Sequence, residues 1–233
     1  MLDVLVFPCT YKCDGKCIMC SIHEKKNYEL SIQELIPFFA NNHVNSIRSI
    51  NITGGEPTLR KDLRELVEMI CSHCKKLSEI IINTNGFDSS NILNKCEEIC
   101  STLPSKIKLW VYVSIDAIDD TADIIRGKRN AALRAMKTID MLIKLKEKYR
   151  ELRVGVSTTI VSKNAFLLDD IFEYVRKKDL FWDIIYATVN TTFIESSAKC
   201  KSFLLNEKEK KAVIEFLPKL LTYDKRTLSQ LQI

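Results

Sequence analysis

The amino-acid sequence predicts an α/β fold: a partial (β/α)6 barrel of the TIM type with parallel strands, open on one side. Six β-type segments alternate with six helix-type segments along the chain, as in successive βαβ units. Right-handed crossovers place every helix on one side of such a sheet if it curls. An eight-fold barrel usually takes about 250 residues or more, so six units in 233 residues fit an incomplete barrel better. A flat, doubly wound sheet is the alternative that this pattern leaves open.

The strands are predicted from short apolar segments that end at polar or glycine-containing turns. One segment alternates apolar and polar side chains from Ile47 to Thr53, and two glycines follow it directly. Another is a longer apolar run from Ile107 to Ile115. Together the predicted strands cover residues 2–7, 47–53, 79–83, 107–115, 152–161 and 182–189.

The helices are predicted from apolar residues three or four positions apart and from residues typical of helix ends. Ser31 and Glu34 form a capping-box pattern at the start of the first helix. Asn164 is expected to cap the fifth helix, and Asn206 begins a last helix that Pro218 should interrupt. The first five predicted helices cover residues 31–41, 61–76, 91–103, 131–149 and 165–178.

Composition and charge narrow the class of protein. Hydrophobic residues make up 46% and charged residues 28% of the chain, and no apolar run approaches the eighteen or so residues that span a bilayer. The N-terminus lacks the basic region of a signal peptide, so we expect a cytoplasmic protein without a membrane partner. The net charge of +5 is mild, and the lysines stand beside glutamates on predicted helices, so a nucleic-acid partner is not expected.

No internal repeat, low-complexity tract or linker divides the sequence. We therefore expect one domain over residues 1–233. Its strands and motifs should lie in residues 1–192, and residues 193–233 should form a C-terminal segment with the final helix.

A cysteine-rich loop follows the first predicted strand. Cys13, Cys17 and Cys20 have the spacing C-x3-C-x2-C, which brings three soft thiolates together as an iron–sulfur cluster or a zinc ion requires. Three ligands instead of four would leave one iron open for chemistry. In a chain with nine cysteines, this spacing arises by chance with a probability of roughly one in a hundred, so the residues that follow must support it. Cys9 would close the site as a fourth ligand, but its place at the strand end favours a buried thiol.

Glycines mark the same end of the predicted sheet. Five of the six glycines follow predicted strands, on the face where barrel enzymes build their sites, and only Gly155 lies within a strand. In the segment Thr53–Pro57, Gly54 and Gly55 let the backbone approach a ligand, and Glu56 offers a carboxylate for an ammonium group. A plain turn between a strand and a helix is the alternative.

Four further cysteines occur on two predicted helices, and a metal site with four thiolates is conceivable for them. Their spacing along the helices also matches inward-facing core positions, which is the interpretation that we favour. They are Cys71, Cys74, Cys96 and Cys100.

The cysteine loop after the first strand and the GGEP motif after the second resemble the radical S-adenosylmethionine (radical SAM) enzymes. The resemblance continues through Asn83–Gly86 after the third strand, Ser114–Ala117 at the end of the fourth, and the pair Arg126–Gly127. It implies a 4Fe–4S cluster on the three loop cysteines, with S-adenosylmethionine chelated to the remaining iron through its amino and carboxylate groups. It also implies that Gly54, Gly55 and Glu56 hold the amino group of the methionine part.

Five more residues stand at positions where members of this family bind the cofactor. The resemblance makes Ser114 and Asp116 candidates to contact the ribose or line its pocket, and Arg126 a candidate partner for the methionine carboxylate. Thr159 and Asn164 occupy the corresponding region after the fifth strand. Polar residues are common at strand ends, so a structural role is the alternative for each of the five.

The family resemblance implies an enzyme that reductively cleaves S-adenosylmethionine to a 5′-deoxyadenosyl radical, which abstracts hydrogen from a substrate. An open barrel would admit a bulky substrate, which favours a peptide or protein. A small metabolite or activation of a glycyl-radical enzyme is the alternative, and a non-catalytic iron–sulfur protein is a further one. The expected partner is an electron donor such as flavodoxin or ferredoxin.

Overall fold

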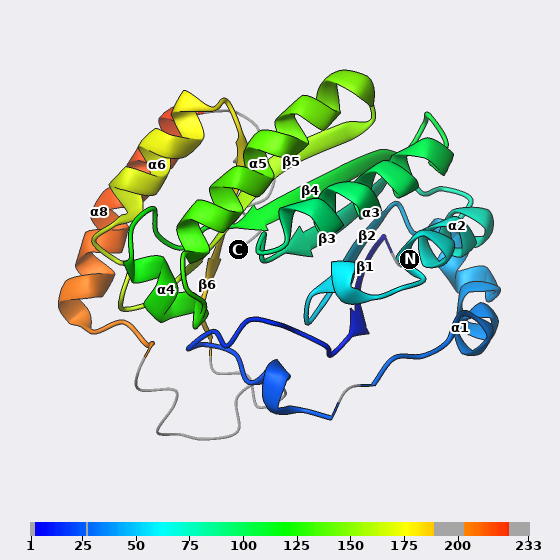
Figure 1. Cartoon of the computed structure of the whole chain (residues 1–233), viewed down its shortest axis with the longest axis horizontal. Helices are drawn as coiled ribbons and strands as arrows, with labels where there is room; N and C mark the ends of the chain where they lie inside the picture. Colours follow the sequence, from blue (N-terminus) through cyan, green and yellow to red (C-terminus); the bar gives the residue numbers. More distant parts are fainter. Residues whose placement is uncertain (1–2, 27, 189–202, 224–233) are drawn as a thin grey trace.

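Six parallel strands lie side by side in chain order, with β1 and β6 at the two edges (Figure 1). The computed structural model describes residues 3–26, 28–188 and 203–223. Within these residues β1 and β6 do not pair, so the sheet is open, and the prediction of a partial barrel is confirmed. The strands are β1 (Val4–Thr10), β2 (Ser49–Gly54), β3 (Glu79–Thr84), β4 (Lys108–Ser114), β5 (Leu152–Ile160) and β6 (Phe181–Tyr186).

Helices connect the strands and cover one face of the sheet (Figure 1). They are α1 (Ile32–Phe39), α2 (Leu63–His73), α3 (Ser89–Thr102), α4 (Thr121–Arg126), α5 (Ala131–Lys148), α6 (Leu168–Lys177) and α8 (Glu207–Tyr223). The sequence did not predict α4 or the short 3-10 helices η1 (Ile22–Glu24), η2 (Asn42–Ser46) and η3 (Pro57–Leu59). One or two turns are too short to display a helical period.

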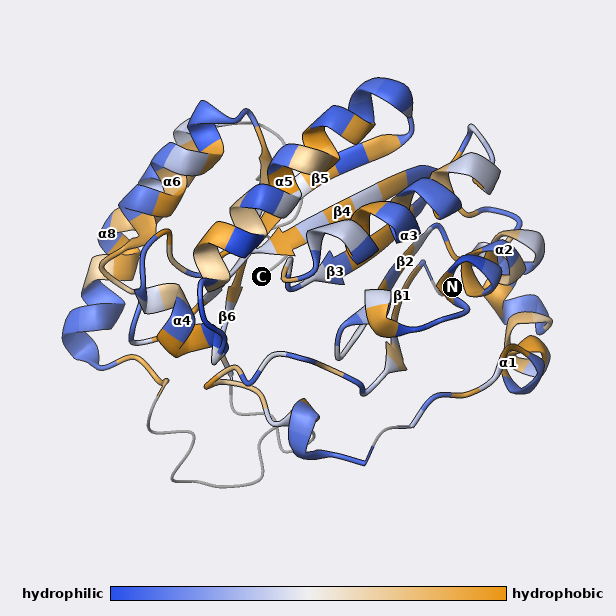
Figure 2. Cartoon of the chain, viewed as in Figure 1, coloured by the Kyte–Doolittle hydropathy of each residue, from blue (hydrophilic) through white to orange (hydrophobic). Residues whose placement is uncertain are grey.

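The core lies between the sheet and the helices. In β2, Ile50 and Ile52 are fully buried on the helix side, whereas Asn51 between them is only partly buried. Both α5 and α6 carry apolar and polar residues in alternation around the helix, as amphipathic helices at a core surface do (Figure 2). The main apolar cluster runs from Cys9 to Leu220, and two smaller clusters lie around Phe87 and around Ile125.

Aromatic side chains gather on the opposite face of the sheet. Trp110 and Tyr112 stack with ring centroids 6.0 Å apart, and Phe181 meets Trp110 edge-on at 4.6 Å. Gly155 explains why these rings fit, because a Cβ atom there would lie 2.6 Å from Cε1 of Tyr112. The one glycine that the sequence places inside a strand therefore makes room for an aromatic ring.

Two predictions about helix ends are wrong. Asn164 does not cap α6, whose N-cap is Leu167. Its side chain accepts a hydrogen bond from Val161 N at 2.8 Å and donates to Thr159 O at 2.9 Å, so it fastens the end of β5. Pro218 does not interrupt α8. Proline lacks an N–H donor for the helix, but the Phe216 ring packs against α6 and β6, and this packing stabilises the helix at that point.

Other element ends match the prediction within a few residues. The capping box of Ser31 and Glu34 is present, with both hydrogen bonds formed. The strand β1 continues past the predicted end at Phe7 to Thr10, where it pairs with Gly54 of β2. The predicted positions Leu2 and Val189, and the parts 193–202 and 224–233 of the C-terminal segment, lie outside the described residues.

We predict that Gly155→Ala lowers the free energy of unfolding by about 1–3 kcal/mol, because the methyl group overlaps the Tyr112 ring. Equilibrium urea unfolding measures this change. In a Tyr112→Leu background the same substitution should cost clearly less, since the obstructing ring is gone. An equal cost in both backgrounds would contradict this explanation.

Candidate active site

The three motif cysteines lie on the loop after β1, which turns around Gly15. The Sγ atoms of Cys13 and Cys17 each lie 3.7 Å from the point that a Gly15 Cβ would occupy, and the Phe87 ring lies 3.3 Å from it. Gly15 N donates to Cys13 Sγ at 3.4 Å, and Cys20 N donates to Cys17 O at 3.1 Å. We call residues 11–20 the cysteine loop.

Backbone contacts hold the cysteine loop against β2 and α4. Glu56 N donates to Lys12 O at 2.8 Å, and Lys16 N donates to Arg126 O at 3.1 Å. A Cβ atom on Gly55 would lie 2.2 Å from Lys12 O. Gly54 and Gly55, predicted to let a ligand approach, therefore also let the cysteine loop pack directly on the end of β2, and Gly54 adopts φ 121° there.

The thiols of the cysteine loop suit an iron–sulfur cluster by chemistry and position. Three soft donors share one short loop, and two of them flank the same glycine. Burial raises the pKa of Cys13 to about 12, so this thiol is protonated at neutral pH until a metal displaces the proton. In residues 3–26, 28–188 and 203–223, no three cysteine, histidine or acidic side chains are already gathered as a metal-binding group. The donors therefore fit the cluster but are not preassembled around it.

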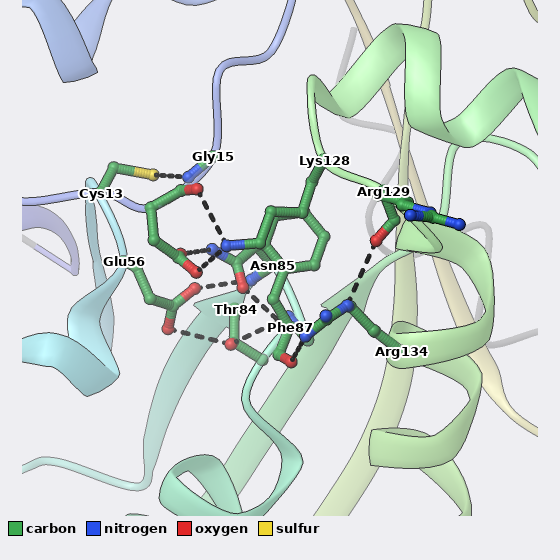
Figure 3. Close-up of polar contacts among 11 residues, drawn as sticks. Cys13, Gly15, Glu56, Thr84, Asn85, Phe87, Lys128, Arg129 and Arg134 are labelled. Atoms are coloured by element: carbon green, nitrogen blue, oxygen red, sulfur yellow. Dashed lines mark hydrogen bonds and ion pairs between the residues drawn. The ribbon is translucent and has the colours of Figure 1, made fainter.

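Glu56 is buried, and its own chain binds both carboxylate oxygens. Oε1 accepts from Thr58 Oγ1 at 2.6 Å and from Thr84 Oγ1 at 2.9 Å, and Oε2 accepts from Asn85 N at 2.7 Å (Figure 3). Burial raises the pKa of Glu56, and these hydrogen bonds act in the opposite direction. In this structure the side chain joins the end of β2 to the end of β3.

Asn85 connects Glu56 to the cysteine loop, a role that the sequence did not reveal. Its Nδ2 donates to Asp14 Oδ1 at 2.7 Å, while its backbone N binds Glu56. Asp14 in turn accepts from Lys128 Nζ at 2.9 Å (Figure 3). The segment Asn83–Gly86 was visible as a motif, but nothing in its spacing showed which side chain would reach the loop.

Four of the weaker candidates form a second network at the ends of β4 and β5. Arg126 Nε and Asp116 Oδ2 form an ion pair at 2.6 Å, and both side chains are buried. Asp116 Oδ1 accepts from Thr159 N at 2.7 Å, and Asn164 Nδ2 donates to Asp116 O at 2.9 Å. Burial raises the pKa of Asp116, which Arg126 opposes. Residues that are far apart in sequence therefore form one polar unit.

This network reaches the cysteine loop, because Arg126 Nη1 donates to Cys17 Sγ at 3.8 Å. Ser114 does not join the network. Its side chain lies partly buried on the inner face of β4, where Ser114 pairs with Ser157 of β5. The structure thus brings Asp116, Arg126 and Cys17 together and leaves Ser114 apart.

Cys9 is a buried core thiol. It is 2% exposed and belongs to the main apolar cluster, and burial raises its pKa to about 12. Its carbonyl accepts from Nη1 of the fully buried Arg60 at 2.7 Å, and Arg60 Nη2 donates to Leu30 O at 2.8 Å. Arg60, which the sequence did not single out, thereby fixes the chain on both sides of the cysteine loop.

The four helix cysteines belong to the core, as we favoured. Cys74, Cys96 and Cys100 are buried within the main cluster, and Cys71 packs against it. Burial raises the pKa of Cys100 to about 12. In the part of the chain that the structure describes, they form no metal-binding group.

Comparison with known proteins identifies the class. The model of the Radical SAM superfamily matches residues 7–162, and the chain belongs to this superfamily. Members of the superfamily are enzymes that use a 4Fe–4S cluster and S-adenosylmethionine. No helix among the described residues is long and apolar enough to cross a membrane.

Curated relatives include proteins with different activities. The sporulation killing factor maturation protein SkfB of Bacillus subtilis is 32% identical over 174 residues, covering 74% of this chain and 39% of that protein. A GTP 3′,8-cyclase of Campylobacter jejuni is 35% identical over 183 residues, covering 76% of this chain and 53% of the cyclase. The chain therefore spans about half the length of the curated relatives that it matches.

Solved structures confirm the fold. The structure of anSMEcpe with bound AdoMet and the Kp18Cys peptide has a TM-score of 0.69 and 20% identity, covering 97% of this chain and 63% of the other. Streptococcus suis SuiB bound to the precursor peptide SuiA has a TM-score of 0.67 and 15% identity, covering 95% and 46%. At such identities the likeness concerns the fold alone.

We predict that Arg126→Met lowers the free energy of unfolding of the cluster-free protein by about 3 kcal/mol, because it leaves Asp116 buried without its partner. Urea unfolding at pH 7 measures the loss. Lys148→Met, which removes the exposed ion pair with Glu97, is the control and should change stability little. If both substitutions lowered the free energy of unfolding equally, the buried pair of Asp116 and Arg126 would contribute no more than an exposed pair, which would contradict this explanation.

Proposed function

We propose that this chain reductively cleaves S-adenosylmethionine and uses the resulting 5′-deoxyadenosyl radical to abstract hydrogen from a peptide or protein. The observation that carries the proposal is that three parts of the chain meet at the C-terminal ends of the strands. The cysteine loop contacts the Gly54–Glu56 turn through Lys12, and it contacts Arg126 through Cys17. Barrel enzymes build their active sites on the face formed by the C-terminal ends of the strands.

Cys13, Cys17 and Cys20 would hold the 4Fe–4S cluster, which when bound supplies the electron that breaks a C–S bond of S-adenosylmethionine. The thiols must lose their protons on binding. Arg126, whose pKa rises because Asp116 and Cys17 outweigh the effect of burial, keeps a fixed positive charge beside one of these ligands. The charge lies beside the sulfur of Cys17, to which Arg126 Nη1 donates at 3.8 Å.

The remaining residues would bind and orient S-adenosylmethionine. The Gly54–Glu56 turn would face the amino group of the methionine part, with Glu56 supplying negative charge from a fixed position. Arg126 has guanidinium donors besides Nε and Nη1, and these would meet the carboxylate. Ser114 and Thr159, partly buried on the inner face, would contact the nucleoside, while Asp116 and Asn164 hold this wall in place.

A peptide or protein substrate is favoured by the names of relatives and by the inner face of the sheet. SkfB is named for the maturation of a sporulation killing factor, and AlbA of Bacillus subtilis, 24% identical over 173 residues, is named for the biosynthesis of the bacteriocin subtilosin. The solved structure of SuiB contains a bound precursor peptide. Trp110 and Phe181, which are only partly buried, offer aromatic surface on that face beside the buried ring of Tyr112. A small metabolite is the second candidate, because GTP 3′,8-cyclases are also among the relatives.

The reaction needs a reductant, and we propose a flavodoxin or a ferredoxin as the donor. We also propose a cytoplasmic location. The eight described cysteines are all free thiols, which suits a reducing compartment.

The proposed activity is tested with protein reconstituted anaerobically with iron and sulfide, then given dithionite and S-adenosylmethionine. We predict about four irons per chain and the release of methionine and 5′-deoxyadenosine, measured by liquid chromatography. Cys17→Ala should abolish cleavage and lower the iron content. Cys71→Ala, which removes a half-buried thiol outside the loop, is the matched control and should retain both.

Two results would contradict the proposal. One is wild-type protein that holds its iron yet releases no 5′-deoxyadenosine. The other is a Cys71→Ala variant that loses iron as completely as Cys17→Ala does.

A further inference from the structure

A hollow of about 640 Å³ lies on the outer side of the cysteine loop, between the loop and the starts of α3 and α5. Asp14 of the loop forms part of its wall, together with Phe87, Lys128, Arg134 and Lys137. Figure 3 shows Lys128 extending beside the Phe87 ring toward the loop, with Arg134 next to Phe87. Phe87, Lys128, Arg134 and Lys137 have no role in the proposed cofactor site, and Asp14 is connected to Glu56 only through Asn85.

Only Gly15 and the Phe87 ring separate the hollow from two of the motif cysteines. The Phe87 ring touches Gly15, and the sulfurs of Cys13 and Cys17 flank the same glycine. Lys128 Nζ lies 5.4 Å from the centre of the Phe87 ring and binds the Asp14 carboxylate. An electron that enters here would therefore have a short path to the cluster ligands.

Cations dominate the rim of this hollow. We define the basic rim as Lys16, Lys128, Arg134 and Lys137; Lys16 joins it because its Cβ lies against Gly127, next to Lys128. Lys16 and Lys137 are exposed and have no ion-pair partner among the described residues.

The carboxylates at the hollow are already bound by their own chain. Asp14 accepts from Asn85 and Lys128, and Asp88 caps α3 by accepting from Asn91 N at 3.1 Å. Asp88 keeps its negative charge, but the two carboxylates stand against the four cations of the basic rim, so the net charge that faces a partner is positive.

A small anion is a poor fit. The backbone N–H groups at the start of α5 would otherwise bind a phosphate, but Asp123 accepts from Asn130 N and Ala131 N at 2.7 Å each. Asp88 does the same at α3. The hollow is instead surrounded by long basic side chains, of which Lys16 and Lys137 have no ion-pair partner among the described residues, and this suits a broad acidic protein surface.

We propose that the basic rim is the docking surface of the electron donor, a small acidic electron-transfer protein. The inference rests on the proposed function, which requires one electron per cleavage. One electron leaves the donor, which is oxidised, and enters the cluster, which is reduced. Electron-transfer partners form small, transient contacts that are steered by charge, and the rim offers such a contact beside the cysteine loop.

The test compares Lys137→Glu with Lys146→Glu in the reconstituted protein, using an acidic bacterial flavodoxin as the probe. Both lysines are exposed on α5 and have no ion-pair partner in residues 3–26, 28–188 and 203–223, but Lys146 lies at the far end, roughly 14 Å along the helix axis. Isothermal titration calorimetry measures the Kd for oxidised flavodoxin, and stopped-flow absorbance measures cluster reduction by its reduced form. S-adenosylmethionine cleavage with dithionite measures the activity that needs no docking.

We expect Lys137→Glu to weaken flavodoxin binding and slow cluster reduction by roughly three- to tenfold at low salt, and to leave dithionite-driven cleavage unchanged. Lys146→Glu should match the wild type in all three measurements. The difference should shrink at about 0.5 M salt, where exposed charges are screened.

Equal flavodoxin affinity and reduction rate in the two variants would overturn the docking surface while leaving the proposed function intact. Failure of the wild type to cleave S-adenosylmethionine with dithionite would instead contradict the proposed function. The binding and reduction measurements would then decide the docking surface by themselves.

Discussion

The site depends on backbone contacts between the cysteine loop and the ends of its neighbouring elements. Glu56 N and Lys16 N both take part in hydrogen bonds that join the loop to β2 and α4. These contacts need glycine at the points of closest approach, since a side chain at Gly55 would overlap the carbonyl of Lys12. A loop fixed by its backbone can present soft thiols in a constant place while leaving their sulfur atoms free to bind metal.

Buried charge supports the same edge of the sheet. Glu56, the pair of Asp116 and Arg126, and Arg60 are all nearly inaccessible to water, and each is held by several hydrogen bonds. Burying charge costs free energy, so networks of this kind contribute less to stability than to geometry. Here the networks join segments far apart in the sequence, such as β2 with β3 through Glu56, or the end of β4 with β5 through Asp116 and Thr159. These networks therefore hold the residues of the proposed site in a fixed geometry, as a reacting centre requires.

The sequence could predict the alternation of strands and helices and the cysteine loop, because these follow from local periodicity and from residue types at fixed spacing. It favoured the open barrel from the number of units in the chain, while periodicity alone also allowed a flat, doubly wound sheet. It could not predict the contacts of Asn85 or Arg60, whose partners lie far along the chain; Arg60 and Cys9 are 51 positions apart. Asn164 is a second case in which distant contacts override a local sequence pattern. Its position before a helical pattern is typical of a cap, yet tertiary contacts with Thr159 and Asp116 determine where its side chain points.

The cysteine loop has two different sides, and this links the proposed cofactor site to the proposed docking surface. On one side Cys17 contacts the buried guanidinium of Arg126, where S-adenosylmethionine would bind. On the other side Gly15, which lies between the sulfurs of Cys13 and Cys17, packs against the Phe87 ring that lines the outer hollow. A donor on the outside and a substrate on the inside would then approach the cluster from different directions. Each could bind without displacing the other, so electron delivery need not open the space in which a reactive radical must be kept from water.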